Sequence, residues 1–535
     1  MNSPFPVIDI FAGPGGLGEG FSSLVNNNRS RKFKIGLSIE KDELAHQTLM
    51  LRSFFRQFEH GKVPEEYYSF VRGDISLEDL YKAFPKESTH AAEEAWCATL
   101  GKMPSDKVEA RVNKALNGAK KWALIGGPPC QAYSLVGRSR NGGIDPEDHR
   151  VYLYREYYRL LAVHNPPVFV MENVKGLLSS KVEGDLIFRQ ILADLRNPAE
   201  AYRKLKGNGI KLECPGYHIY SLVKKPSGFD IEGEPDFCPE DFIIKAEKYG
   251  IPQARHRIIL LGIRKDFDIQ PSILKESATV KLEDVLFGLP RLRSGLSKGD
   301  DSGDAWREAI QKLTANGILK KADSEVVSRI NKVAEDLSIP QKDRGKEFVK
   351  DYTADTKYRP QWYLDSKLKG VCNHSSRSHI VSDLHRYLFA ACYAVIKKIS
   401  PKLQDFPEKL LPDHKNVDEA LTDGKFNDRF RVQLADRPAT TVTSHIAKDG
   451  HYYIHYDPTQ CRSLTVREAA RIQTFPDNYY FCGPRTSQYS QVGNAVPPLL
   501  AKQIAEIVYD VLSEVQVQNK AANISSPKAF VWQTR

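Results

Sequence analysis

Short apolar runs alternate with charged, periodic segments along the first half of the chain. The run Pro6–Phe11 has the length and character of a buried strand, residues 12–20 form a glycine-rich turn, and a helix is expected from Phe21. Similar runs, each followed by turn residues and helical periodicity, occur at Lys34–Ile39, Trp122–Ile125 and Val168–Met171. This alternation predicts an α/β fold with a parallel, doubly wound sheet.

The pattern changes in the second half. The apolar runs Asp241–Ala246 and Arg257–Ile263 predict a neighbouring pair of strands at the end of the sheet. The chain then becomes polar, loop-rich and poorly periodic, which predicts a second, irregular lobe. Apolar residues return at helical spacing in Pro497–Val515, so we expect a helix there that packs on the first lobe.

These changes of pattern suggest three parts. We predict a first domain, a second domain, and a hinge with a C-terminal helix that returns to the first, at residues 1–265, 266–465 and 466–535. Residues 76–120 and 183–235 are expected to be peripheral insertions around the first sheet.

Composition narrows the class of protein without deciding its function. The chain has 535 residues and a net charge of +10, which would favour a polyanionic partner. Its eight cysteines form no Cys-x-x-Cys pair, so we expect reduced thiols, a cytoplasmic protein and no metal. The spacing of Cys372, His374 and His379 matches no standard metal site and favours loop residues. We expect no signal peptide and no membrane span, because the longest apolar run, near Tyr387–Ile396, is too short.

A candidate ligand site begins at the glycine-rich turn. The segment Phe11-Ala-Gly-Pro-Gly-Gly-Leu-Gly18 lies between a strand and a helix, where glycines let a nucleotide-like ligand approach the backbone; a tight structural turn is the alternative. Glu40 ends the second run, where its carboxylate can accept hydrogen bonds from ribose hydroxyls. Asp74 is expected to end the next strand and to accept a hydrogen bond from an adenine amino group. A solvated carboxylate is the alternative for both.

A candidate nucleophile follows the strand at Trp122–Ile125. In Gly126-Gly-Pro-Pro-Cys-Gln-Ala-Tyr-Ser134, the thiol of Cys130 lies on a polar turn, whereas an inert cysteine prefers a strand or helix interior. Glu172 ends the following strand, so its carboxyl group and the thiol are expected at one edge of the sheet. Arg255 and Arg257 occupy alternate positions, which face the same side of a strand, and could bind an anion near the thiol; an exposed basic edge is the alternative.

These segments and two later ones form an ordered set: Asp9-Ile-Phe-Ala-Gly-Pro-Gly-Gly, Gly-Gly-Pro-Pro-Cys130-Gln, Met-Glu172-Asn-Val, Gln253-Ala-Arg-His-Arg257, Arg437-Pro-Ala-Thr and Gln491-Val-Gly-Asn494-Ala-Val-Pro. The set resembles the ordered motifs of the DNA cytosine-5 methyltransferase family. The unmatched middle, about 266–436, corresponds to the variable target-recognition region of that family. The resemblance implies a Rossmann-like, S-adenosylmethionine-dependent methyltransferase domain with a smaller, irregular target-recognition lobe.

The resemblance also implies a mechanism and its residues. Carbon 5 of cytosine is a poor nucleophile, so the Cys130 thiolate would add to carbon 6 while Glu172 holds and helps protonate ring nitrogen 3. Arg255 and Arg257 would brace the base and the catalytic loop and bind backbone phosphate. The cytosine would be flipped out of double-stranded DNA into the pocket. The implied cofactor residues are Phe11, Ala12, Gly13, Gly15, Gly16, Leu17, Glu40, Asp74, Ile75, Pro128, Leu153 and Asn494. The implied DNA contacts are Gln131, Ser134, Arg437, Thr440 and Thr441.

Two other functions stay open. A branch of the family methylates cytosine in transfer RNA, but the long recognition region favours DNA. An inactive DNA-binding regulator is the second alternative, and the presence of Cys130, Glu172 and Arg257 argues against it. No chromatin-reading or zinc domain is added, which favours a monomeric prokaryotic modification enzyme paired with a cognate restriction endonuclease. The recognised DNA sequence depends on side chains of an irregular lobe and is not predicted.

Overall fold

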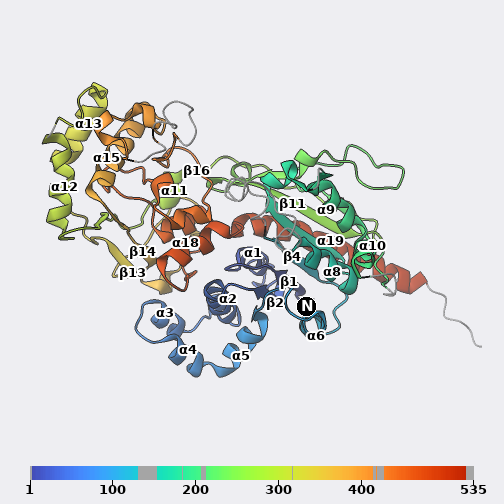
Figure 1. Cartoon of the computed structure of the whole chain (residues 1–535). Helices are drawn as coiled ribbons and strands as arrows, with labels where there is room; N and C mark the ends of the chain where they lie inside the picture. Colours follow the sequence, from blue (N-terminus) through green and yellow to red (C-terminus); the bar gives the residue numbers. More distant parts are fainter. Residues whose placement is uncertain are drawn as a thin grey trace, which may run out of the picture.

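The computed structural model contains a lobe built on a sheet and a second lobe of helices and loops (Figure 1). It describes residues 3–129, 153–182, 185–206, 212–315, 317–413, 417 and 427–525. None of the described helices combines the length and the apolar character of a membrane span.

The first lobe contains an eight-stranded sheet. Its strands are β1 (Phe5–Ile10), β2 (Phe33–Glu40), β3 (Ala95–Cys97), β4 (Ala123–Gly126), β5 (Val168–Val174), β8 (Tyr217–Tyr220), β9 (Ile243–Lys245) and β11 (His256–Arg264). They lie in the order β3-β2-β1-β4-β5-β11-β8, with β9 also paired to β11. The strands β3, β2, β1, β4 and β5 are parallel to one another, as predicted. In contrast, β11 runs antiparallel to β5, β8 and β9. The predicted parallel arrangement therefore extends from β3 to β5 and does not include the strands at this end.

Successive residues of each strand enter two different cores. Ile8 and Ile10 of β1 face a core that is covered by α6 (Ser105–Leu116), α8 (Tyr154–His164), α9 (Ile187–Arg196) and α10 (Pro198–Lys206). Val7 faces the opposite core, which contains residues of α1 (Gly16–Ser22) and α19 (Pro498–Ser525). The helix predicted at Pro497–Val515 is confirmed, and its residues Leu500 and Ile504 pack in the first lobe.

The two expected insertions are parts of this lobe rather than peripheral additions. The first contains α4 (Leu77–Ala83), α5 (Pro85–Glu94), the edge strand β3 and helix α6. The second contributes α9, α10 and the edge strand β8, and its residues Ile191 and Tyr217 are fully buried in the core. Their elements are short and amphipathic, so the sequence shows no continuous apolar run.

The second lobe combines helices with a small two-stranded antiparallel sheet. Its helices include α11 (Leu282–Leu286), α12 (Gly303–Ala315), α13 (Ser324–Glu335), α14 (Pro360–Tyr363) and α15 (Val381–Lys397), and the two strands are β13 (Gly345–Lys350) and β14 (Gly370–Ser375). The apolar run Tyr387–Ile396 lies in α15. Helix α17 (Val466–Ile472) shares a core with α11 and with Val371 of β14.

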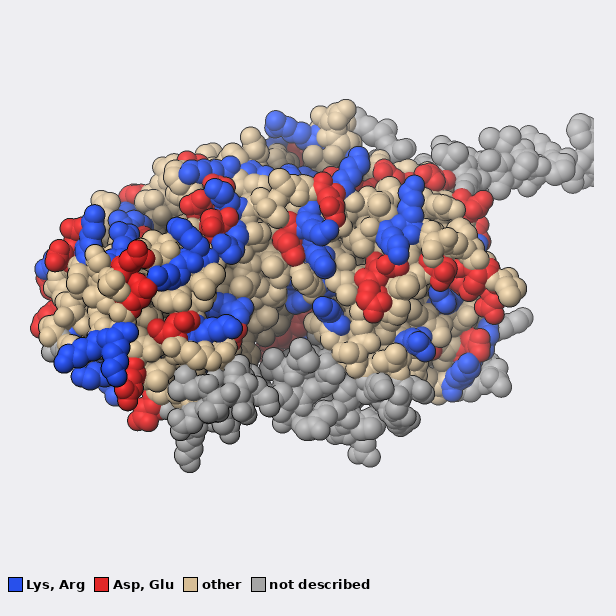
Figure 2. Space-filling view, turned by 90° about the horizontal axis from the view of Figure 1, so that it is seen from above, with Lys and Arg blue, Asp and Glu red and all other residues tan. Residues whose placement is uncertain are grey.

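The lobes join through short paired segments and the last helices. Strand β10 (Gln253–Ala254) pairs with β16 (Ala439–Thr440), and α18 (Arg485–Asn494) leads into α19, which crosses behind the sheet (Figure 1). Seen from above, the surface is hollowed between the lobes, and Lys and Arg side chains lie on both sides of the hollow (Figure 2).

Candidate active site

The ends of four neighbouring strands place predicted catalytic and cofactor residues at one edge of the sheet. Ile39 of β2 pairs with Ile10 of β1, Ile10 pairs with Gly126 of β4, and Gly126 pairs with Met171 of β5. The next residues along these strands are therefore neighbours at the edge: Glu40, Phe11, Gly127 and Glu172. In parallel α/β sheets, ligands bind outside this edge.

One side of the glycine-rich turn is open. Phe11, Gly13 and Gly15 have φ angles of 56°, 57° and 96°, a left-handed conformation that glycine adopts without strain. The Ala12 N–H donates a hydrogen bond to the Ile39 carbonyl over 3.0 Å. A Cβ added at Gly13 would meet no atom within 4 Å. A ligand can therefore approach the backbone at Gly13.

The other side of the turn is packed. A Cβ at Gly16 would lie 2.3 Å from the Val496 carbonyl oxygen, and a Cβ at Gly15 would lie 3.0 Å from the Tyr479 hydroxyl. Leu17 is 5% exposed and belongs to the core beneath the sheet. The Leu17 side chain is therefore turned into the core by helix α1, and a cofactor contact of Leu17 stays a prediction.

Glu40 lies beside the open side of the turn. Its Oε2 accepts a hydrogen bond from the Gly13 N–H over 2.8 Å. Its Oε1 accepts from the N–H groups of Lys41 and Asp42, each over 2.8 Å. The carboxylate therefore has a fixed orientation next to the exposed backbone of Gly13.

An ion pair between Glu172 and Arg257 lies on the two strands at the far end of the edge. Arg257 Nε is 3.0 Å from Glu172 Oε1, and the side chains are 16% and 14% exposed. A Cβ added at Gly127 would lie 2.8 Å from Glu172 Oε2, so only glycine allows the end of β4 to approach this carboxylate so closely. Cys130, Gln131 and Ser134 lie outside the described residues, and the described chain before them reaches Pro129.

Arg255 contacts different neighbours from Arg257. It lies between β10 and β11 rather than within one continuous strand, and it is 2% exposed. Its Nη1 donates to the Val442 carbonyl over 2.7 Å, and its guanidinium also donates to the Gly493 carbonyl over 3.3 Å. The buried guanidinium of Arg255 thus joins the two lobes, and its phosphate contact stays a prediction.

Asp74 does not end a strand, which corrects our expectation. The strand next to β2 is β3, and its Cys97 pairs with Glu40. Asp74 follows α3 (Glu65–Val71) in an exposed turn, where it forms ion pairs with Lys350 at 2.7 Å and Arg72 at 3.1 Å. Hydrogen bonds from Lys350 and Arg72 lower the pKa of Asp74.

The intervening helices α4 and α5 explain this error. They separate the turn at Asp74 from the strand that completes the edge. Ile75 packs against an apolar cluster of that region. Cys97, the exposed residue opposite Glu40, could not be found from the sequence, because three-residue β3 is too short to show an apolar pattern. A cofactor role for Asp74 and Ile75 stays a prediction.

Three other predicted cofactor residues border this region. Pro128 is buried directly after Gly127. Leu153 precedes α8, and its Cδ2 would lie 3.5 Å from a Cβ at Gly101, in the loop after β3. Asn494 ends α18 with its side chain exposed, two residues before the Val496 carbonyl that faces the glycine turn.

Comparison with known proteins decides the family. The model of the family described as C-5 cytosine-specific DNA methylase matches residues 82–199 and 237–509. The chain belongs to this family. It is a DNA (cytosine-5-)-methyltransferase of the Rossmann-like α/β class, as the motifs predict.

Similar proteins match the methylase along most of its length. Type II methyltransferase M.Bpa9945I of Bacillus paralicheniformis is 30% identical over 95% of this chain and 99% of its own. Type II methyltransferase M.DdeI of Desulfomicrobium norvegicum is 25% identical over 97% of this chain and 92% of its own. DNA (cytosine-5-)-methyltransferase M.ApeKI of Aeropyrum pernix is 28% identical over 75% of this chain and 83% of its own.

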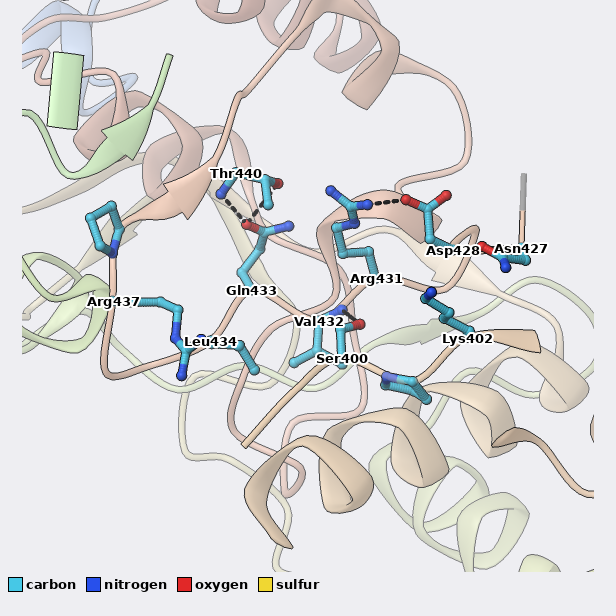
Figure 3. A pocket seen from close by; sticks show the side chains of 12 residues that line it. Ser400, Lys402, Asn427, Asp428, Arg431, Val432, Gln433, Leu434, Arg437 and Thr440 are labelled. Atoms are coloured by element: carbon cyan, nitrogen blue, oxygen red, sulfur yellow. Dashed lines mark hydrogen bonds and ion pairs between the residues drawn. The ribbon is translucent and has the colours of Figure 1, made fainter. Parts of the chain in front are cut away.

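Two of the predicted DNA-contacting residues of the methylase border a pocket in the second lobe (Figure 3). The pocket has a volume of about 390 Å³, and its lining includes Lys402, Arg431, Arg437 and Thr440. Arg431 is paired with Asp428. The exposed Arg437 pairs with its neighbour Asp436 at 2.9 Å, and its Nη2 donates to the Lys398 carbonyl over 3.3 Å.

The two threonines after Arg437 have different contacts. The hydroxyl and the N–H of Thr440 donate to Gln433 Oε1 over 3.1 and 2.9 Å (Figure 3). The Thr441 hydroxyl donates to the Ala254 carbonyl over 2.6 Å. Thr440 thus faces the pocket, whereas Thr441 joins the second lobe to β10, directly before Arg255.

Cys372, His374 and His379 do not converge on one point, because each side chain bonds to a different partner. The Cys372 thiol donates to the Asp477 carbonyl over 3.2 Å, and His374 lies between Thr465 and the Pro290 carbonyl. His379 contacts the Tyr387 hydroxyl. Burial lowers the pKa of His374 to about 4 and that of His379 to about 3. Among the described residues, no cluster of three His, Cys, Asp or Glu side chains could hold a metal.

Proposed function

We propose that this methylase transfers a methyl group to carbon 5 of cytosine within a specific sequence of double-stranded DNA, with Cys130 as the covalent nucleophile. One observation carries the proposal. The Glu172–Arg257 pair lies against Gly127, three residues before Cys130, and the open glycine turn lies on the adjacent strand β1. A base between thiol and carboxylate would thus lie next to the methyl donor.

The residues at the turn fit S-adenosylmethionine. Gly13 leaves space for a ligand, Glu40 presents a carboxylate for ribose hydroxyls, and the half-buried ring of Phe11 can pack against adenine. Pro128, Leu153 and Asn494 would complete the site. When bound, S-adenosylmethionine supplies an electrophilic methyl group. The product would be S-adenosylhomocysteine.

The protein's own residues would activate the cytosine ring. The Cys130 thiolate forms a bond to carbon 6, and the electron pair of the ring double bond makes carbon 5 nucleophilic. Glu172 holds the proton at nitrogen 3, which stabilises the negative charge that the addition creates. Arg257 holds Oε1, so Oε2, on the side of Gly127, is left to face the base. After methylation, carbon 5 loses its proton and the thiolate leaves carbon 6.

The hollow between the lobes would hold the DNA. Carbons 5 and 6 of a stacked cytosine are inaccessible to the thiol, so the base must be flipped into the site. Arg437 and Thr440 border the pocket in the second lobe, where Arg437 could contact a phosphate. Gln131 and Ser134, which follow Cys130, would contact the DNA beside the flipped base.

We also propose a modification role in a restriction–modification system. Two of the similar proteins are called type II methyltransferases. Methylation by this protein would protect host DNA from a cognate restriction endonuclease. DNA methylated in vitro and mapped to one short sequence should resist an endonuclease that cuts there. Cleavage at the methylated sites would contradict the protective role.

Labelled methyl transfer from S-adenosylmethionine to DNA and, in parallel, to total RNA tests the reaction. We expect 5-methylcytosine in DNA, and no product with Cys130→Ser although DNA binding is retained. Cys238→Ser, at an exposed cysteine, is the matched control and should stay active. Label only in RNA would favour the RNA enzyme, whereas cofactor and DNA binding without label would favour the inactive regulator.

A further inference from the structure

A segment held by the second lobe reaches the cofactor turn of the first. We call Pro476–Cys482 the strap. Its backbone is bound by second-lobe residues: Arg467 donates to the Pro476 and Tyr479 carbonyls over 3.0 and 2.6 Å. The Asp477 N–H donates to the Tyr363 carbonyl over 2.8 Å. The strap is therefore anchored to the second lobe.

The same strap is bound by helices of the first lobe. Arg52 of α2 (Glu43–Arg56) donates to Asn478 Oδ1 over 3.1 Å, and the Tyr67 hydroxyl of α3 donates to the Asn478 carbonyl over 2.9 Å. The Cys482 N–H donates to the Thr48 hydroxyl over 2.8 Å. The strap therefore connects the lobes behind the glycine turn.

Tyr479 extends from the strap to the turn itself. It is fully buried, and its hydroxyl donates a hydrogen bond to the Pro14 carbonyl. Its ring lies 4.7 Å from that of Phe475 and 4.8 Å from the Arg52 guanidinium, measured to the ring centroid. These contacts fix the ring, so the hydroxyl has a defined position.

The backbone of Pro14 has fewer ways to be held by hydrogen bonds than the backbone of its neighbours. Proline has no N–H, so its carbonyl is its only hydrogen-bonding group on the backbone. It stands between Gly13, whose open side faces the proposed ligand, and Gly15, whose added Cβ would contact the Tyr479 hydroxyl. Glu40 accepts the Gly13 N–H and the Ala12 carbonyl accepts the Gly15 N–H, so the Tyr479 hydroxyl adds the restraint on the residue between two conformationally permissive glycines.

We propose that Tyr479 is a positioning residue for cofactor binding: its hydroxyl holds the Pro14 carbonyl and so sets the glycine turn relative to the second lobe. The inference rests on the proposed S-adenosylmethionine site at Gly13. It adds that the lobe expected to read the DNA also determines how well the turn is shaped for the cofactor.

The test compares two tyrosines that make the same kind of bond. Tyr479→Phe removes the hydroxyl on Pro14. Tyr217→Phe is the control, because Tyr217 is also fully buried and donates to a proline carbonyl, that of Pro166, at the far side of the sheet. Calorimetric titration with S-adenosylhomocysteine gives the Kd, methyl-transfer kinetics give KM and kcat, and a melting curve gives Tm.

We expect Tyr479→Phe to raise the Kd for S-adenosylhomocysteine about fivefold, the value of one hydrogen bond, and to raise KM for S-adenosylmethionine with little change in kcat. Tyr217→Phe should lower Tm similarly but leave Kd and KM unchanged. Equal Kd values for Tyr479→Phe and the wild-type protein would overturn the inference. A wild-type protein that binds no S-adenosylhomocysteine would instead contradict the proposed function.

A second variant keeps the test decisive if Tyr479→Phe does not fold. Asn478→Ala removes the strap's side-chain contacts with Arg52 and with Asp365 at a partly exposed position and leaves Tyr479 in place. Because the strap is then held less tightly, we expect the Kd to rise about threefold. An unchanged Kd for a folded Asn478→Ala protein would count against the inference.

Discussion

Glu172 is oriented by two residues whose size and shape both matter. Arg257 binds one carboxylate oxygen, and Gly127 leaves room for the other. A planar guanidinium donates along a fixed direction, which a lysine ammonium does not, so Arg257 sets the angle of the carboxylate as well as its charge. The geometry proposed for catalysis thus depends on the missing side chain of Gly127 as much as on the guanidinium of Arg257.

Replacing Arg257 should therefore damage catalysis more than binding. We expect Arg257→Ala to lower kcat about a hundredfold, because the carboxylate loses its orientation, while the Kd for S-adenosylhomocysteine stays the same. Steady-state methyl transfer and calorimetry measure the two effects. Arg264→Ala, at the other end of β11 where Arg264 pairs with Asp266, should keep its kcat. A kcat for Arg257→Ala near that of Arg264→Ala would refute the role.

The open side of Gly13 gives a second test. Alanine at Gly13 or at Gly118 adopts a left-handed φ, at 57° and 76°, and neither added Cβ meets an atom within 4 Å. Both variants should lose about 1 kcal/mol of stability from strain. Only Gly13→Ala should weaken S-adenosylhomocysteine binding, about tenfold, because its methyl group occupies the ligand's space. Equal Kd values for the two variants would show that the ligand does not approach Gly13.

Elements with continuous apolar runs were predictable, and short edge elements were not. Strands β1, β2, β4 and β5 and helix α19 lie within a residue or two of their predicted starts because each is buried in a core. Strands β3 and β8 have three and four residues at sheet edges, and a run of residues carries no sign of its direction, so the antiparallel β11 was not foreseen.

The same limit applies to the site. Glu40 is the last residue of the long strand β2, and Glu172 lies near the end of β5, so their place at the edge could be derived from the sequence. The position of Asp74 could not be derived, because helices α4 and α5 separate it from β3, the strand next to β2. The different partners of Arg255 and Arg257 result from the break between β10 and β11 and from contacts with residues far away in the chain, which no local pattern reveals.

Buried histidines make the elements of the second lobe sensitive to acid. Burial lowers the folded-state pKa of His374 of β14 and of His455 to about 4, and that of His379 of β15 (Ser378–His379) to about 3. In the unfolded chain, histidine titrates near pH 6.5. Below that pH the unfolded state binds protons that the folded state does not, so stability falls as the pH decreases from about 6.5 to 4.

Each of the three histidines should contribute up to about 1.4 kcal/mol per pH unit in this window. Asp9 acts in the opposite direction, since burial raises its pKa to about 8, but it is a single group. We therefore expect the urea midpoint to fall between pH 7 and pH 5, before unpaired carboxylates titrate. A His379→Asn variant should show a shallower fall, and a midpoint independent of pH would contradict these burial effects.

At the scale of the whole molecule, the lobes are joined at several separate places. The β10–β16 pair, the carbonyl contacts of Arg255, and the strap all connect them. The net charge of +10 and the basic side chains beside the hollow add attraction for DNA. DNA affinity should therefore decrease as salt increases, with a slope set by the number of phosphates contacted.

The contribution of Arg437 to that slope can be measured. We expect Arg437→Ala to weaken DNA binding and to reduce the slope of log Kd against log salt by about 1, as for one lost phosphate contact. Arg307→Ala is the control, because Arg307 is exposed on α12 and pairs with Asp304 within the same helix. Identical slopes for the two variants would exclude Arg437 from phosphate binding.

The position of α19 has a consequence for how the protein is made. Val7 and Phe21, near the start of the chain, share one core with Leu500 and Val508 near its end. While the ribosome is still translating the second lobe, this face of the sheet lacks α19, and the apolar side chains that α19 covers are exposed to water and to other nascent chains. The first lobe is the first to be synthesised but can complete its folding only after the last helix has emerged.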